Sequence, residues 1–548
     1  MPPIPRPASV WRRRLVRLGL IVLAPSGLLL AAELCLRLAG YGYPTAFVLR
    51  DADHGMYYSN DRFVWQFYSS KTGLSPQPFA VAAQKPPGTI RLVILGESAA
   101  VGTPDPSYGF ARILERFLHH QYPRTRFEVI NAAVRGINSH VIRVIARDCV
   151  VLQPDLFIAY MGNNEIVGLY APGPHAGYLT PYLHVLRAIQ WLKTTRVGEL
   201  MGQWLERLGS GAAPPENQDM AFFRNHRLAA DDPRREAVYR NFRSNLDDIC
   251  QTASRSGAKL ILSTLADNLA DSPPFGSLHR ANLTVTAKTR WEDAYAQGVA
   301  AETRGQFTQA IRHYHDAARV DDHFADLHFR LGRCSLAADQ FTDAGREYRL
   351  ARDWDALQFR CDSRLNRIIR ETASAYGDAG VRLADAAQAL AESPLSTRRI
   401  PGQSLFYDHV HLTFQGDYLL ARTFYPLVIA ALTNRLAERP AAADLPSLAE
   451  CAASLAFTPL NEAQIRVAML EAMAQPPFPD QLDHRQRLAA DRQALQTRFG
   501  KLDQTDVQRA IATYQAAIQQ TPDDWQLYYN FARLLFTLRR YDLTIPQF

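Results

Sequence analysis

Three side chains, far apart in the sequence, are of the types that together perform acyl transfer. Ser98 follows the apolar run 92–95 and Gly96, so it stands in a small-residue turn after an expected strand. Asp408 and His411 lie more than three hundred residues further along the chain. A serine hydroxyl becomes a good nucleophile at neutral pH when a base takes its proton and a carboxylate orients that base. The pattern predicts Ser98 as the nucleophile, His411 as the base and Asp408 as the orienting group.

Two further segments offer hydrogen-bond donors for such a reaction. Residues 127–138 form an apolar strand pattern followed by Gly136, whose backbone can approach a substrate closely. Residues 155–165 form a second strand pattern that runs into a turn containing Asn164. We expect the backbone amides of Ser98 and Gly136 and the side-chain amide of Asn164 to bind a developing oxyanion.

These segments, taken in order, resemble the four sequence blocks of the SGNH/GDSL hydrolase family, which are named for a serine, a glycine, an asparagine and a histidine. The resemblance covers residues 90–278 and 370–436, about half of the chain. It implies a flavodoxin-like α/β fold and hydrolysis of carboxylic esters. By this resemblance the triad is Ser98, Asp408 and His411, and the oxyanion hole is Ser98, Gly136 and Asn164.

Two positions depart from the family pattern. The first block usually reads Gly-Asp-Ser and has Glu97 here, and the third usually ends Asn-Asp and has Glu165 here. Both changes keep the negative charge but lengthen the side chain. The detailed geometry of these two turns therefore stays open at this point.

Five short apolar runs alternate with helical patterns along the catalytic part of the chain. Runs of this length are typical of a parallel sheet that is covered by helices on both faces. The sequence therefore predicts a three-layer α/β/α fold with a parallel five-stranded sheet. The expected strands are residues 91–95, 127–131, 156–160, 259–263 and 381–386.

A helical, self-similar segment interrupts the sheet between its fourth and fifth strands. Small and aromatic residues recur there at a period of 34, which is similar to the tetratricopeptide repeat. The recurring pairs are Gly298 and Gly332, Phe307 and Phe341, Ala310 and Ala344, Tyr314 and Tyr348, and Ala317 and Ala351. The pattern returns from Ala510 to Tyr541, and the chain stops at Phe548, where a second helix is expected. We expect this last repeat to be truncated or to be completed by a partner.

These patterns predict seven consecutive regions. They are a basic tail (1–17), an anchor or signal (18–40), a lead-in segment (41–88), the first part of the hydrolase domain (89–282), inserted tetratricopeptide-like helices (283–360), the second part of the hydrolase domain (361–436) and a C-terminal helical region with tetratricopeptide-like helices (437–548).

The amino terminus carries an arginine cluster before an apolar run. Residues 18–32 are uncharged, and the apolar character continues past Glu33 and Arg37 to Gly40. We expect an uncleaved anchor in the bacterial inner membrane, with the arginines inside and the catalytic domain facing the periplasm or the cell exterior. The alternative is a cleaved signal peptide, whose apolar region has this shorter length.

Composition excludes several other functions. The chain is 47% hydrophobic and 21% charged, which is typical of a globular protein. Its net charge is +7, but five of its arginines lie in the first seventeen residues. The charge therefore does not indicate a nucleic-acid groove. His409 and His411 could face one metal ion, but no third ligand stands nearby in the sequence. We therefore expect neither a metal nor a cofactor, and we assign His409 no role.

The leading hypothesis is a membrane-anchored serine esterase that acts on an acyl ester. A glycan or another cell-envelope polymer as the carrier of that ester is an analogy with extracytoplasmic SGNH relatives. The same triad serves an O-acyltransferase equally well. A third hypothesis is an assembly scaffold with a vestigial hydrolase domain, because stacked helical pairs bind protein partners. In each case the repeats are expected to recruit a partner and not to perform chemistry.

Overall fold

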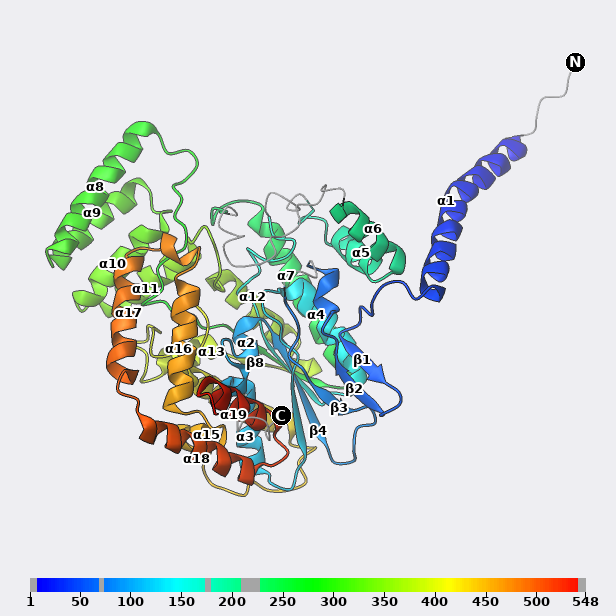
Figure 1. Cartoon of the computed structure of the whole chain (residues 1–548). Helices are drawn as coiled ribbons and strands as arrows, with labels where there is room; N and C mark the ends of the chain where they lie inside the picture. Colours follow the sequence, from blue (N-terminus) through cyan, green and yellow to red (C-terminus); the bar gives the residue numbers. More distant parts are fainter. Residues whose placement is uncertain (1–6, 69–72, 173–178, 208–226, 541–548) are drawn as a thin grey trace, which may run out of the picture.

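The computed structural model describes residues 7–68, 73–172, 179–207 and 227–540 (Figure 1). Its centre is a parallel sheet of five strands in the order β5-β4-β6-β7-β8. The strands are β4 (Ile90–Gly96), β5 (Phe127–Asn131), β6 (Leu156–Tyr160), β7 (Lys259–Ser263) and β8 (Val381–Ala384). The predicted strands and the flavodoxin-like sheet are confirmed. Strand β8 ends earlier than expected because Asp385 caps the following helix through the amide of Gln388.

Helices cover both faces of this sheet, which confirms the predicted three-layer fold. On one face lie α3 (Phe110–Gln121), α13 (Ala386–Glu392) and α14 (Phe414–Leu432). On the other lie α4 (Ser139–Asp148), α7 (Arg235–Ser256) and α12 (Ser363–Ala375). Every residue of β4 is buried, as expected for a central strand with helices on both sides.

The lead-in segment forms a small antiparallel sheet that the sequence did not predict. Its strands are β1 (Val48–Asp51), β2 (Met56–Ser59) and β3 (Ala80–Ala82). Each is only three or four residues long, too short to show a clear alternation of apolar and polar residues. After this sheet's first hairpin, the hydroxyl of Tyr68 donates a hydrogen bond of 2.9 Å to the carbonyl of Gly136. The lead-in segment thus supports the predicted glycine block.

The inserted helices stack as two antiparallel pairs. They are α8 (Val285–Thr303), α9 (Phe307–Val320), α10 (Ala325–Ala337) and α11 (Phe341–Asp353). A Cβ atom on Gly298 would collide with the ring of Tyr314, and one on Gly332 would lie 2.9 Å from the ring of Tyr348. The recurring glycines are therefore required because the aromatic ring of each second helix packs on the backbone of the first.

All regular elements of the C-terminal region, residues 437–540, are helices. It comprises α15 (Leu448–Ser454), α16 (Pro459–Met473), a 3-10 turn (Phe478–Asp480), α17 (His484–Phe499), α18 (Gln504–Gln520) and α19 (Trp525–Thr537). In Figure 1, α16 and α17 stand beside α10 and α11, whereas α18 and α19 lie near α3. The predicted end of the last repeat, residues 541–548, lies outside the described residues.

The predicted membrane anchor is wrong. Residues Pro7–Leu38 form a helix, α1, but no helix among the described residues is long and apolar enough to cross a bilayer. A span needs about 20 predominantly apolar residues, whereas only 18–32 are uncharged before Glu33. The predicted location in the inner membrane, with an outward-facing catalytic domain, depended on that span and is therefore also wrong.

Two further helices, α5 (Leu183–Lys193) and α6 (Arg196–Arg207), form a hairpin, and α6 packs on α1.

Candidate active site

Ser98 stands at the carboxyl end of β4, at the point where the chain order of the sheet reverses. This position is where open parallel sheets bind their ligands. A Cβ atom on Gly96 would collide with the carbonyl oxygen of Tyr160 on the neighbouring strand, so the turn needs a glycine there. Ser98 is half-buried and is the first residue of the short helix α2 (Ser98–Val101). The side-chain amide of Asn131 holds that helix by donating to the carbonyls of Ala100 and Val101 at 3.0 and 3.2 Å.

The predicted oxyanion donors come from the ends of three neighbouring strands. Gly136 follows β5, is exposed and has a φ of +71°, a conformation that only glycine adopts without strain. The amides of Ser98 and Gly136 donate to no residue in the part of the chain that the structure describes. The Asn164 side chain, after β6, donates one hydrogen to the carbonyl of Ile137 at 3.0 Å. An amide group carries two hydrogens, so Asn164 retains one for a ligand.

Asp408 and His411 form the predicted pair. The Oδ2 atom of Asp408 lies 2.7 Å from Nδ1 of His411, and its Oδ1 accepts the amides of Val410 and His411 at 2.9 and 2.8 Å. Burial alone would raise the pKa of Asp408, but the neighbouring imidazoles of His411 and His409 outweigh it and hold that pKa well below its usual range. The carboxylate therefore stays ionised and fixes the tautomer of His411 that leaves Nε2 free to act as a base.

The two glutamates that depart from the family pattern both hold the site together. The carboxylate of Glu97 accepts the backbone amides of Gly162, Asn163 and Asn164 at 3.2, 2.8 and 3.4 Å. It therefore ties the serine block to the asparagine block. Burial, and then the charge of Glu165, raise the pKa of Glu97, whereas these three amides oppose the rise.

Glu165 fastens the asparagine block to the start of α4. Its two oxygens accept the backbone amide and the hydroxyl of Ser139, each at 2.7 Å. Burial raises the pKa of Glu165 to about 7. The two glutamates, which stand where the family pattern has aspartates, thus make contacts between neighbouring blocks. These contacts leave one side-chain hydrogen of Asn164 without a partner among the described residues.

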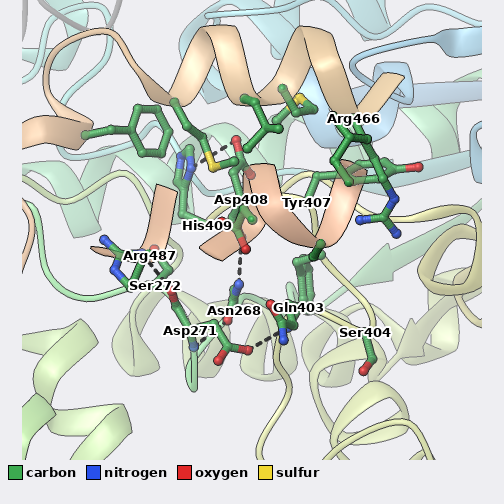
Figure 2. Close-up of a pocket in the computed structure, with 18 of the residues that line it drawn as sticks. Asn268, Asp271, Ser272, Gln403, Ser404, Tyr407, Asp408, His409, Arg466 and Arg487 are labelled. Carbon is green, nitrogen blue, oxygen red and sulfur yellow. Dashed lines mark hydrogen bonds and ion pairs between the residues drawn. The ribbon is translucent and has the colours of Figure 1, made fainter. Parts of the chain in front are cut away.

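Sequence reasoning missed Asn268, which follows β7 and positions the histidine block. Its side chain donates to the carbonyl of Asp408 at 2.9 Å, and its backbone amide donates to the carbonyl of His409 at 3.0 Å (Figure 2). The only available signal was its place directly after an expected strand, because an asparagine in a loop is most often part of a turn. The loop after β7 thus brings Asp408 and His411 to the same sheet edge as Ser98.

A cavity of about 330 Å³ borders this loop on one side (Figure 2). Asp408 and His409 line it together with Asn268, and α16 and α17 supply much of its remaining wall. Ser98 and His411 do not line this cavity. The described residues contain no hydrogen bond between Ser98 and His411, and Nε2 of His411 is buried without a partner there. The base therefore has a free nitrogen, and its contact with the nucleophile stays a prediction.

Comparison with known proteins identifies the helical regions. The model of a tetratricopeptide repeat family matches residues 295–356 and 501–547. The match confirms tetratricopeptide repeats in the insertion and, in the C-terminal region, from residue 501 on. No curated protein matches the chain.

Three solved structures are similar to the chain at low identity. One, described as TesA, is 10% identical with a TM-score of 0.26, and the match covers 62% of this chain and 99% of that one. The α/β hydrolase LAE5 from the metagenome of Lake Arreo, Spain, is 11% identical with a TM-score of 0.27, covering 64% and 97%. The acetyl xylan esterase AlAXEase is 12% identical with a TM-score of 0.26, covering 62% and 100%. Likenesses this distant do not assign a function to this chain.

Proposed function

We propose that this protein is a serine hydrolase that cleaves a carboxylic ester. The observation that carries the proposal is the joint arrangement at one sheet edge: a serine opening a helix, free amides at Ser98 and Gly136, and the Asp408–His411 pair at 2.7 Å. Nε2 of His411 takes the hydroxyl proton as Ser98 attacks the acyl carbon. The oxyanion then receives hydrogen bonds from the amides of Ser98 and Gly136 and from Asn164. His411 next protonates the leaving alcohol, and water resolves the acyl-serine by the same steps in reverse.

The exposed side of the site supports a large alcohol group as the leaving part of the ester. Gly136 and the adjacent Arg135 are both exposed, so this side of the predicted oxyanion hole faces solvent among the described residues. We therefore infer an O-acyl ester on a carbohydrate or a similar polymer as the substrate class to test first. An O-acyltransferase would use the same residues, with a sugar hydroxyl in place of water. Product analysis with and without an acceptor sugar distinguishes the two.

The repeats support a protein partner in addition to the ester substrate. Helices α8 and α9 pack around Trp291 and Tyr314 in a core that they share with α10 and that lies apart from the sheet. Stacked helical pairs of this kind offer concave surfaces to peptides. We infer that this pair recruits a partner while the sheet edge performs the chemistry.

Replacement of the nucleophile tests the proposed function. Ser98→Ala removes one hydroxyl from a half-buried turn, so the fold should remain and hydrolysis of a short-chain nitrophenyl ester should fall by roughly three orders of magnitude or more. Ser107→Ala, in the next turn of the chain, is the matched control and should retain activity. Covalent labelling by a fluorophosphonate should map to Ser98.

Two results would contradict the proposal. Wild-type turnover in Ser98→Ala would show that another group is the nucleophile. A folded wild-type protein that neither hydrolyses esters nor reacts with the fluorophosphonate would favour the scaffold hypothesis, in which the repeats carry the function.

A further inference from the structure

A second imidazole lies against the carboxylate that orients His411. Nδ1 of His409 is 3.3 Å from Oδ2 of Asp408, the same oxygen that lies 2.7 Å from Nδ1 of His411. His409 is 4% exposed, and its Nδ1 is buried without a hydrogen bond of good geometry to any described residue. The Asp408 carboxylate therefore lies beside this nitrogen without accepting a well-aligned hydrogen bond from it.

Three phenylalanines from separate parts of the chain surround the His409 ring. Phe275 comes from the loop after β7, Phe359 from the segment that follows α11, and Phe478 from the C-terminal 3-10 turn. Their ring centroids lie 5.2, 6.1 and 5.7 Å from that of His409. The three rings also belong to one buried cluster. These three rings fix the position of the His409 ring and leave it bordering the cavity on one side.

We propose that His409 is a positioning residue of the triad, which places a neutral Nδ1–H group beside Asp408 and thereby limits how strongly that carboxylate attracts the proton of His411. The inference rests on the proposed hydrolase function and extends it to a residue that neither touches the substrate nor receives the serine proton. The inference also gives the insertion and the C-terminal helical region a role in the site, because Phe359 comes from the first and Phe478 from the second.

The charges around His409 agree with a neutral imidazole. Burial lowers the pKa of His409, and the charges of His411 and Arg360 act in the same direction, whereas Asp408 opposes them. Arg360 is itself paired with Asp355. On the cavity side stand Asp271, Asp491, Arg466, Arg487 and Arg498. A histidine that remains neutral acts through its N–H dipole and not through a full charge.

Two substitutions separate the N–H group from the ring. His409→Phe keeps an aromatic ring among the three phenylalanines but removes the donor, whereas His409→Asn places an amide N–H near the position of Nδ1 and loses the ring. Without the donor, Asp408 attracts the proton of His411 more strongly. The acid limb of the pH profile of kcat/KM should therefore move upward by about half to one pH unit in His409→Phe. His409→Asn should retain the wild-type limb.

Two outcomes of these profiles would overturn the proposal. One is an unchanged acid limb in His409→Phe, and the other is an equal shift in both variants, which would assign the effect to ring packing. The profiles use a nitrophenyl ester, so they require that the protein be an esterase.

A readout that needs no activity keeps the proposal separate from the proposed function. NMR of the ¹⁵N-histidine-labelled full chain reports the protonation of each imidazole nitrogen. In the wild type, His409 should remain the neutral Nδ1–H tautomer throughout the pH range of the activity profile. A neutral Nε2–H tautomer of His409, or its protonation within that pH range, would overturn the proposal even if the variants fail to fold. A protein without esterase activity but with the expected tautomer would contradict only the proposed function.

Discussion

The inserted repeats and the C-terminal repeat are attached to the same hydrolase domain in different ways. The end of the insertion makes buried polar contacts with the hydrolase domain. Arg352 pairs with buried Asp267 at 2.9 Å. Arg360 donates to the carbonyls of Asn268 and Ser272 at 3.1 and 2.8 Å. Asp355 accepts the backbone amides at 275 and 276, at 2.9 and 3.0 Å. All of these partners lie in the loop after β7, which holds Asp408 and His409.

The C-terminal repeat is attached instead to the flank of the domain. The Tyr514 hydroxyl lies 2.8 Å from that of Tyr108, and Asp524 pairs with both Arg112 and Arg116 on α3. These contacts fix α18 and α19 against a helix that covers the sheet and do not touch the histidine block. The two attachments therefore predict different consequences: loss of the first should impair both stability and chemistry, and loss of the second should impair stability alone.

The largest effect is expected where the insertion enters the domain. Arg352→Ala leaves the carboxylate of Asp267 buried without its partner, so the free energy of unfolding should fall by about 3 to 5 kcal/mol. The loop after β7 should shift with it, and kcat/KM should fall on the order of tenfold, because misplaced catalytic groups lose rate steeply. Urea denaturation and ester hydrolysis measure the two effects.

Arg346→Ala on the same helix is the matched control. Arg346 is about half-exposed. It pairs with Asp343 and with the buried Glu347, which keeps its contact of 2.7 Å with His328 when Arg346 is lost. The substitution should therefore cost about 1 kcal/mol and leave kcat/KM unchanged. Loss of stability in Arg352→Ala with fully retained kcat/KM would contradict the proposed link between the insertion and the histidine block.

A smaller effect is expected at the C-terminal attachment. Asp524→Ala removes a carboxylate that two arginines share, so the free energy of unfolding should fall by about 1 to 3 kcal/mol, while kcat/KM stays at the wild-type value. Asp523→Ala, at the exposed neighbouring position, is the control and should cost little. A loss of kcat/KM in Asp524→Ala at full folding would remove the contrast between the two attachments.

The contribution of Asp524 should also depend on pH. Burial raises its pKa, but Arg112 and Arg116 outweigh burial and hold the pKa below its usual range. A carboxyl group whose pKa is lower in the folded state stabilises the protein above its unfolded pKa, about 3.9, and loses that effect as the pH falls through the folded value. The difference in unfolding free energy between wild type and Asp524→Ala should thus shrink from pH 7 to about pH 3. A constant difference would contradict the ion pair as its cause.

The smallest effect is expected at the tyrosine pair. Tyr108→Phe removes one hydroxyl from a buried contact, and Tyr514 keeps the donor from Asn461 at 3.0 Å. The cost should be about 0.5 to 1.5 kcal/mol without a change in kcat/KM, measured by the same denaturation and hydrolysis experiments. A cost as large as that of Asp524→Ala would show that the hydroxyl pair and not the ion pairs carries the C-terminal attachment.

Much of the fold could be predicted because its signals are local or periodic. Five apolar runs of strand length between helical patterns gave the parallel sheet, and a period of 34 residues gave the repeats. The small sheet β1–β3 gave no such signal, because its strands are too short for a pattern to develop. The predicted membrane span was wrong because fifteen uncharged residues are fewer than a bilayer requires.

The sequence by itself determined the residue types of the candidate site and the strand that carries each block. Only the tertiary structure decided how Glu97 reaches three amides of another strand end, how Asn268 holds Asp408, and how His409 meets three rings from three segments. The physical reason is that strand and helix patterns arise from neighbours in the chain, whereas a contact of a single side chain with a segment fifty or more residues away depends on how the elements pack. A lone glutamate, asparagine or histidine has no period from which its partner can be predicted.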